Sequence, residues 1–366
     1  MIAVPKTKIL LLAFTLILLL PLNSLPSATA SSKEEAEKSV NAAHNTIIKC
    51  YEAAAEAQKA GANVTSLLNE LNKAGQEYSK AVLAYNNKNY SLAAELAYKS
   101  ESILENFVEK ANQLKVEAIE HNHRDFMINF VGSGVGSVLI IVVSLGIWTL
   151  LKRKYATEGR KTKVEDYRAL FLVITFVTAL LVASPALSRL LVYPRTEFFT
   201  ELWILDSNHR AENYPFNISN SQNYNIYLGV GNHLGYCAYY TIQVKFRNQT
   251  QPAPTSFGPI EERSPSGLPS LFNITAFVAD EQVLEIPLTF SFNYAWNETS
   301  SKVKFSSLTL NNVRLNISDY TISWDPDARA FRGFLFFELW LYNSTESNFQ
   351  YHGRFVGLWL NMTVPV

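Results

Sequence analysis

The sequence predicts a multi-domain membrane protein built from an extracellular antiparallel helical bundle, a hairpin of two transmembrane helices and an extracellular β-sandwich. Three observations lead to this prediction. Two apolar runs are long enough to cross a membrane, a short basic loop separates them, and the apolar pattern has a helical period before the first run and a strand period after the second. The predicted segments are a bundle at 31–125, a first span at 126–151, a loop at 152–168, a second span at 169–192 and a sandwich at 193–366.

The composition limits the classes of partner. The chain has 32 basic and 32 acidic residues among 366, so it has no net charge with which to hold nucleic acid. Charged residues make up 17% and apolar residues 48%, which fits a chain that is partly dissolved in lipid. Membrane lipid is therefore an expected partner, and nucleic acid is not.

The two cysteines, Cys50 and Cys237, fall in different predicted domains. Such a pair provides neither a disulfide framework nor a metal-binding motif. We expect two separate buried thiols. A Cys50–Cys237 disulfide is the less favoured alternative, because it needs Cα atoms about 4.4–6.8 Å apart.

Residues 1–30 have the layout of a secretory signal peptide. Lys6 and Lys8 give a basic start, residues 9–20 are apolar, and Ala28-Thr29-Ala30 supplies small residues at the expected cleavage site. We expect cleavage after Ala30, and a retained anchor is the alternative. In both cases the residues that follow lie outside the cell.

The predicted bundle contains three helices. Ser31-Ser32 supplies an N-cap for the first helix, which runs to Ala60 and ends at Gly61. A second apolar stripe with helical spacing starts at Asn63 and ends before a turn at 86–89, and a third stripe runs from Tyr90 to Ala111. Short connections between amphipathic helices favour antiparallel neighbours.

The basic loop between the two apolar runs sets the predicted orientation. A Lys/Arg excess in a short loop marks the cytoplasmic side of a membrane, so both large domains are expected outside the cell. The loop cations are Lys152, Arg153, Lys154, Arg160, Lys161, Lys163 and Arg168. The second run is interrupted only near its end, by Pro185 and Arg189.

Nine Asn-x-Ser/Thr triplets lie in the segments predicted to be outside, and they support this orientation as candidate glycosylation sites. They are Asn63, Asn89, Asn217, Asn248, Asn273, Asn297, Asn316, Asn343 and Asn361.

Small residues in the first span favour close helix packing. Gly132 and Gly136 lie on one helix face with Ser133 and Ser137 beside them. The second span is the expected partner because the short loop keeps it nearby. A homo-oligomer through the first span is the alternative.

Seven stretches after the second span alternate aromatic and β-branched residues, a pattern typical of strands in a β-sandwich. They are 198–205, 224–231, 238–247, 283–294, 303–310, 331–342 and 353–364. Glu338 lies inside an otherwise apolar strand, where a carboxylate needs a partner. We expect a buried ion pair between Glu338 and Arg354.

Part of the chain resembles the uncharacterised archaeal membrane-protein family called domain of unknown function 1616. The matching motifs are Thr196-Glu197-Phe198-Phe199, 211–215 (AENYP), Gly231-Asn232-His233 and 240–244. The resemblance covers roughly the second span and the first two thirds of the β domain. It implies an archaeal source and an Ig-like sandwich next to the membrane, and it implies no known activity.

The sequence offers no template for catalysis. It contains no G-x-S-x-G, H-E-x-x-H, G-x-x-x-x-G-K or C-x-x-C motif, so we expect no catalytic, metal or cofactor site. A carbohydrate-processing enzyme would need carboxylates gathered in a cleft. The loop candidates for such a cleft are Asp206, Glu212, Asp325 and Asp327.

These features predict a membrane-anchored structural or interaction protein of an archaeal cell surface, with an envelope protein or glycan as partner. Two alternatives stay open. One is a membrane sensor or assembly accessory that acts with a partner subunit, and the other is an envelope carbohydrate-processing enzyme.

Overall fold

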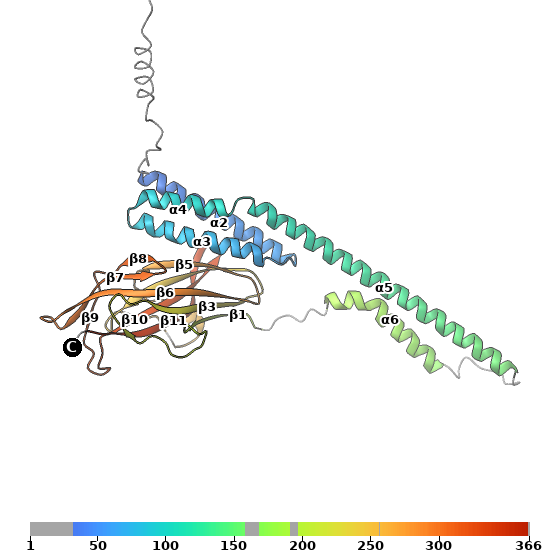
Figure 1. The fold of residues 1–366 in the computed structure, drawn as a ribbon. Coiled ribbons are helices and arrows are strands. Elements are labelled where there is room, and N and C mark those ends of the chain that lie inside the picture. Colours follow the sequence, from blue (N-terminus) through green and yellow to red (C-terminus); the bar gives the residue numbers. More distant parts are fainter. Residues whose placement is uncertain (1–31, 158–167, 191–196, 256, 365–366) are drawn as a thin grey trace, which may run out of the picture.

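A computed structural model describes residues 32–157, 168–190, 197–255 and 257–364. It contains an N-terminal helical bundle, one long apolar helix with a shorter helix beside it, and two β-sheets (Figure 1). The predicted signal peptide at 1–30 and most of the predicted basic loop at 152–168 lie outside the described residues.

Three helices form the bundle: α2 (Lys33–Lys59), α3 (Thr65–Asn86) and α4 (Tyr90–Ile103). The side chain of Ser32 caps α2 by accepting a hydrogen bond from the Glu35 amide at 3.1 Å. Gly61 ends that helix in the left-handed region, with φ +93°. The predicted starts and ends of these helices are confirmed, except that α4 ends at Ile103 instead of continuing to Ala111.

The fourth helix, α5 (Phe107–Thr157), is 51 residues long and joins the bundle to the apolar part of the chain. Asn106, with φ 59°, separates it from α4. Lys115 of α5 forms an ion pair with Glu56 of α2 at 2.6 Å, and the Asn122 amide donates to the Ala60 carbonyl at 3.1 Å. Beyond Asn122, α5 leaves the bundle.

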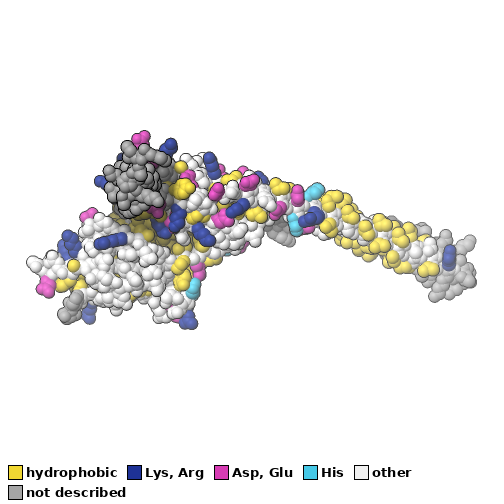
Figure 2. Space-filling view, turned by 45° about the horizontal axis from the view of Figure 1, so that its top comes forward, with side chains coloured by type: hydrophobic (Ala, Val, Ile, Leu, Met, Phe, Trp, Pro, Cys, Tyr) yellow, Lys and Arg dark blue, Asp and Glu magenta, His cyan; other side chains and the backbone are white. Residues whose placement is uncertain are grey.

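Large apolar side chains are exposed along the outer part of α5, which Figure 2 shows as a continuous hydrophobic surface. By length and composition, one helix among the described residues could cross a membrane; it runs over Tyr90–Leu150 and includes most of α5. The apolar part of α6 (Arg168–Leu190) is shorter, at Leu170–Pro185. The exposed residues on α5 are Met127, Ile128, Phe130, Val131, Val135, Val138, Leu139, Ile141, Val142, Val143, Leu145, Ile147 and Leu150.

The helix α6 packs along α5. Trp148 meets Phe171 edge to face at 5.5 Å, and Ser137 is only 4% exposed. A Cβ placed on Gly132 or Gly136 would meet no atom within 4 Å. Within the described residues, α6 therefore does not pack closely against Gly132 or Gly136, although the sequence predicts such packing.

The β domain consists of two sheets. The six-stranded sheet has the order β1-β3-β6-β7-β8, with β9 also paired to β7, and the five-stranded sheet has the order β2-β11-β10-β4-β5. The first sheet comprises β1 (Phe199–Leu205), β3 (Tyr224–His233), β6 (Gln282–Asn297), β7 (Lys302–Leu310), β8 (Val313–Asn316) and β9 (Thr321–Ser323). The second comprises β2 (Asn217–Ile218), β4 (Ala238–Arg247), β5 (Phe272–Val278), β10 (Arg332–Asn343) and β11 (Asn348–Met362).

One hydrophobic core joins the two sheets. Leu228 and Phe290 of the first sheet and Ile242, Phe246 and Leu335 of the second are fully buried in the same cluster. The sheets therefore pack face to face. All seven predicted strands are present, and the short or peripheral strands β2, β5, β8 and β9 were not predicted.

The bundle packs on the outer face of the five-stranded sheet. The ring centroid of Tyr51 in α2 lies 5.6 Å from that of Tyr239 and 6.0 Å from that of Phe277. The Tyr51 hydroxyl donates to the Cys237 carbonyl at 3.0 Å. Cys50 and Cys237 are free thiols buried in this shared core, and burial raises their pKa values to about 11 and about 12. The two predicted domains therefore form one packed unit.

Helix α3 also covers β5, which is an edge strand of that sheet. The Asn72 side chain donates to the Phe277 carbonyl at 2.9 Å and accepts from the Phe277 amide at 2.8 Å, so it takes the place of a neighbouring strand. Ser79 and Thr275 share a hydrogen bond at 3.0 Å. Helix and strand lie so close at Gly75 that a Cβ there would be 2.6 Å from Thr275 Cγ2.

Candidate functional site

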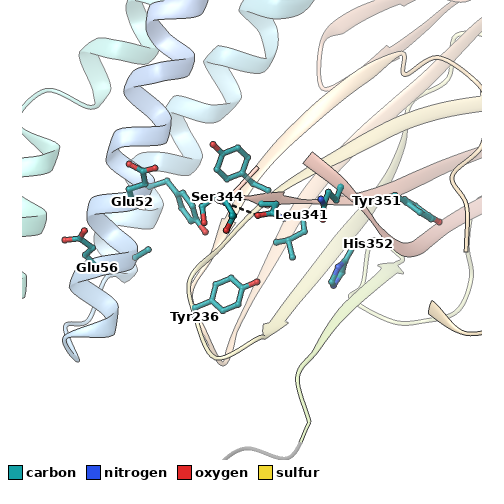
Figure 3. Close-up of a pocket in the computed structure, with 13 residues that line it drawn as sticks. Glu52, Glu56, Tyr236, Leu341, Ser344, Tyr351 and His352 are labelled. Carbon is teal, nitrogen blue, oxygen red and sulfur yellow. Dashed lines mark hydrogen bonds between the residues drawn. The ribbon is translucent and has the colours of Figure 1, made fainter. Parts of the chain in front are cut away.

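A cleft of about 670 Å³ lies between α2 and the hairpin of β10 and β11 (Figure 3). Both parts of the packed unit contribute to it, together with the loop between β3 and β4. The lining residues are Tyr51, Glu52, Ala55, Glu56, Tyr236, Leu341, Tyr342, Asn343, Ser344, Thr345, Gln350, Tyr351 and His352.

Local structure fixes both walls of this cleft. Tyr51 is 5% exposed and locks α2 to the sheet, so Glu52 and Glu56, on the same helix, are held at the opening. On the other wall, Asn343 Oδ1 accepts from the amides of Thr345 and Glu346 at 2.9 and 3.4 Å. This side-chain turn holds the end of the hairpin.

The charged residues of the cleft are acidic. Among its described lining residues are two glutamates and neither Lys nor Arg. Lys115 of α5, which is paired with Glu56, lowers the pKa of that carboxyl group through a hydrogen bond and its charge. The cleft therefore favours a neutral or basic partner over a phosphorylated one.

His352 and Tyr351 line the cleft as uncharged groups. Burial, and then the charge of Arg354, lowers the pKa of His352 to about 4, and its Nε2 lies 2.9 Å from Thr200 Oγ1. Burial, and then the charge of Glu338, raises the pKa of Tyr351 to about 12. Near neutral pH neither side chain carries a charge, and the Tyr351 hydroxyl is buried with no hydrogen-bond partner among the described residues.

The predicted Glu338–Arg354 ion pair is wrong. Glu338 instead pairs with Lys245 on β4 at 2.7 Å, and the two side chains are 0% and 3% exposed. Arg354 is the register partner of Leu339, whose side chain points into the core between the sheets, whereas Glu338 alternates to the outer face. The two groups therefore lie on opposite faces of the sheet.

The buried pair also fastens the long loop between β4 and β5. The Ser266 amide donates to Glu338 Oε1 at 2.7 Å, and Lys245 Nζ donates to the Ser266 carbonyl at 3.2 Å. Both charges therefore have hydrogen-bond partners in the sheet or in the loop, as a buried pair requires.

The carboxylates considered for a carbohydrate-processing enzyme belong to separate turns. Asp206 Oδ1 accepts from the amides of Asn208 and Arg210 at 2.8 and 2.9 Å. Asp325 Oδ1 accepts from the amide of Asp327 at 3.1 Å. No contact among the described residues joins the Asp206 turn to the Asp325 turn.

The structure separates the nine glycosylation candidates by exposure. Asn63, Asn89, Asn217, Asn273, Asn297 and Asn316 are exposed, whereas Asn248, Asn343 and Asn361 are half-buried. The Nδ2 group to which a glycan would be attached already donates to Thr321 in Asn248 and to Asn217 in Asn361, at 3.2 and 2.9 Å.

We expect glycans at the six exposed asparagines and none at Asn248 or Asn361, because those two side chains hold loops together in the folded domain. Mass spectrometry of peptides from the native membrane protein checks this expectation. Asn217 and Asn361 allow a direct comparison of an exposed and a half-buried acceptor at one place in the fold, because Asn361 Nδ2 donates to Asn217 Oδ1. A modified Asn361 beside an unmodified Asn217 would contradict the expectation.

Comparisons with known proteins add no relative: no family model matches the chain, and no curated protein matches it. Within the described residues, no group of three or more His, Cys, Asp or Glu side chains is placed to hold a metal ion. The cleft itself was not predicted from the sequence. One signal was available in Tyr51, a large ring in an alanine-rich helix that needs an equally large surface to pack on.

Proposed function

We propose that this chain is a membrane-anchored interaction protein of an archaeal cell surface. In this proposal α5 and α6 lie in the membrane, the bundle and the two sheets stand outside the cell as one unit, and the cleft receives an envelope protein or a glycan.

The observation that carries the anchoring is the course of α5. The helix is packed against α2 at Lys115 and Asn122 and then continues with large apolar side chains exposed on every side except the one that α6 covers. A surface of this extent is unfavourable in water, and lipid is the solvent that matches it. The apolar face of α6 supports a second span.

The cleft supports the interaction role. Its two walls come from segments almost 300 residues apart in the chain, yet Tyr51 fixes them in one core. A preformed concave site with a few polar groups is the usual form of a binding site. The acidic rim favours basic or neutral surfaces.

A photo-crosslinking experiment tests this role. A benzoylphenylalanine at position 350, inside the cleft, should give a defined adduct in intact membranes, and Glu52→Lys should remove it by reversing the charge of the rim. The same photo-crosslinker at position 304, on the outer face of the other sheet, and the Glu298→Lys change serve as matched controls. An adduct that survives Glu52→Lys, or one obtained equally at position 304, would refute the role of the cleft.

The sensor alternative is supported by one feature. Because α5 is a single helix from the bundle to Thr157, a movement of the outer unit reaches the far end of α5 directly. A partner subunit found by crosslinking from the end of α5 would favour this alternative.

The Ig-like classification and the archaeal source are part of the same proposal. Two largely antiparallel sheets that share one core support the classification. The motif resemblance in the region of β1 and β3 supports the source.

A further inference from the structure

Three exposed aromatic residues lie at one end of the sheets. Phe198, Phe199 and Tyr236, here called the aromatic tip, are 61%, 40% and 47% exposed, and Tyr236 also lines the cleft. Phe198 lies against Gly235, because a Cβ on that glycine would be 2.9 Å from Phe198 Cε1. The tip is therefore a contiguous surface formed by the start of β1 and the loop between β3 and β4.

A series of contacts links the tip to the point where α5 leaves the bundle. The Gly235 amide donates to Asp280 at 2.9 Å, and the Gln282 side chain donates to Thr65, the first residue of α3, at 3.0 Å. Close to the start of α3, the Ala60 carbonyl accepts from Asn122 of α5. Figure 1 shows β1 on the side of the sheets that faces α6.

The distance along α5 from its last contact with the bundle to its apolar part matches the thickness of a headgroup layer. The continuous exposed apolar stretch of α5 begins at Met127, five residues beyond Asn122, which is about 7.5 Å along the helix. The headgroup layer on each side of the hydrocarbon core is roughly 5–7 Å thick. Aromatic side chains are enriched at this depth because they combine apolar surface with polar edges.

The charges near the tip argue against attraction by anionic lipid. Glu201 and Glu281 lie on either side of His233, at 3.7 and 3.2 Å, and the Phe199 ring stacks on that histidine. Contact with a membrane would therefore depend on the aromatic rings and not on a basic patch.

We infer that the aromatic tip rests in the lipid headgroup region of the membrane that holds α5, so that the β domain has its own contact with the bilayer. This inference rests on the proposed anchoring. The surface that the aromatic tip contacts is the headgroup layer of uncharged lipids.

Spin labels on the full-length chain in phosphatidylcholine nanodiscs test the inference. The labels are placed through Tyr236→Cys at the tip, Leu139→Cys on the apolar part of α5, and Trp324→Cys. Trp324 is 49% exposed and follows β9, which pairs with the start of β7 at the opposite end of the sheets. The native thiols are buried and free.

The measured quantity is the ratio of collisions with oxygen to collisions with a water-soluble nickel chelate. We expect a ratio at position 236 between the high value at 139 and the low value at 324. A ratio at 236 equal to that at 324, with 139 in lipid, would overturn the inference and leave the anchoring intact. A water-like ratio at 139 would instead refute the anchoring.

A second change tests the role of the rings. Phe198→Ala should move the label at 236 towards the water-like value, because it removes most of the remaining aromatic surface. Phe257→Ala is the matched control, since Phe257 is 86% exposed and lies outside the tip. An unchanged ratio in the Phe198→Ala chain would refute contact through the rings.

Discussion

Replacing Glu338 with leucine should lower the free energy of unfolding by about 3–5 kcal/mol, because Lys245 would keep a buried charge without its partner. Replacing both residues, by Glu338→Leu with Lys245→Met, should restore most of that stability, since an apolar pair of similar volume is often as stable as a buried ion pair. Denaturant unfolding in detergent, followed by tryptophan fluorescence, measures both effects.

The same change should release the loop that Ser266 holds. Without Glu338 the Ser266 amide loses its acceptor, so hydrogen exchange at that amide should become faster in the single variant. The exposed ion pair of Lys110 with Glu70 provides the control, and Lys110→Met should cost less than about 1 kcal/mol. Equal stability of Glu338→Leu and the unchanged protein would show that the pair contributes nothing.

Replacing Gly75 with leucine should separate the bundle from the five-stranded sheet. The new side chain would begin 2.6 Å from Thr275 Cγ2 and 2.9 Å from its Cβ, so helix or strand must move. Overpacking of this kind costs about 1–3 kcal/mol, which corresponds to a roughly 5- to 150-fold increase in the open population. The Asn72 bonds to Phe277 should be lost first.

Thiol chemistry measures this separation directly, since Cys50 and Cys237 are buried in the interface. Alkylation of these two thiols under native conditions should be slow in the unchanged protein. In the Gly75→Leu chain it should be roughly 5- to 150-fold faster, in proportion to the open population. Gly267→Leu is the control, because a Cβ at Gly267 meets no atom within 4 Å. Slow alkylation in the Gly75→Leu chain would contradict the tight packing of α3 on β5.

Local patterns were sufficient to predict the helices of the bundle and seven of the strands, because each depends on neighbours in the chain. Ser32 and Gly61 mark the ends of α2 by their own chemistry, and apolar and polar residues alternate in β4 from Tyr240 to Arg247. The strand β5 is as long as β1, and it was missed because it follows a long loop that interrupts the strand pattern.

Contacts between distant residues could not be predicted in this way. Asn72 and Phe277 are separated by 205 positions, and no periodicity connects them. The partner of Glu338 was misassigned because the face on which Arg354 lies depends on the hairpin register, which shifts between Leu339 and Trp340. The cleft was missed for the same reason, since its walls meet only after the bundle has packed on the sheet.

The position of Asn72 has a consequence for biosynthesis. The ribosome makes α3 before β5, so the Asn72 side chain that pairs with the Phe277 backbone is synthesised before that edge strand. An unpaired edge strand is a common site at which chains aggregate. In this protein a helix from the N-terminal half of the chain can therefore protect an edge strand of the C-terminal half from aggregation.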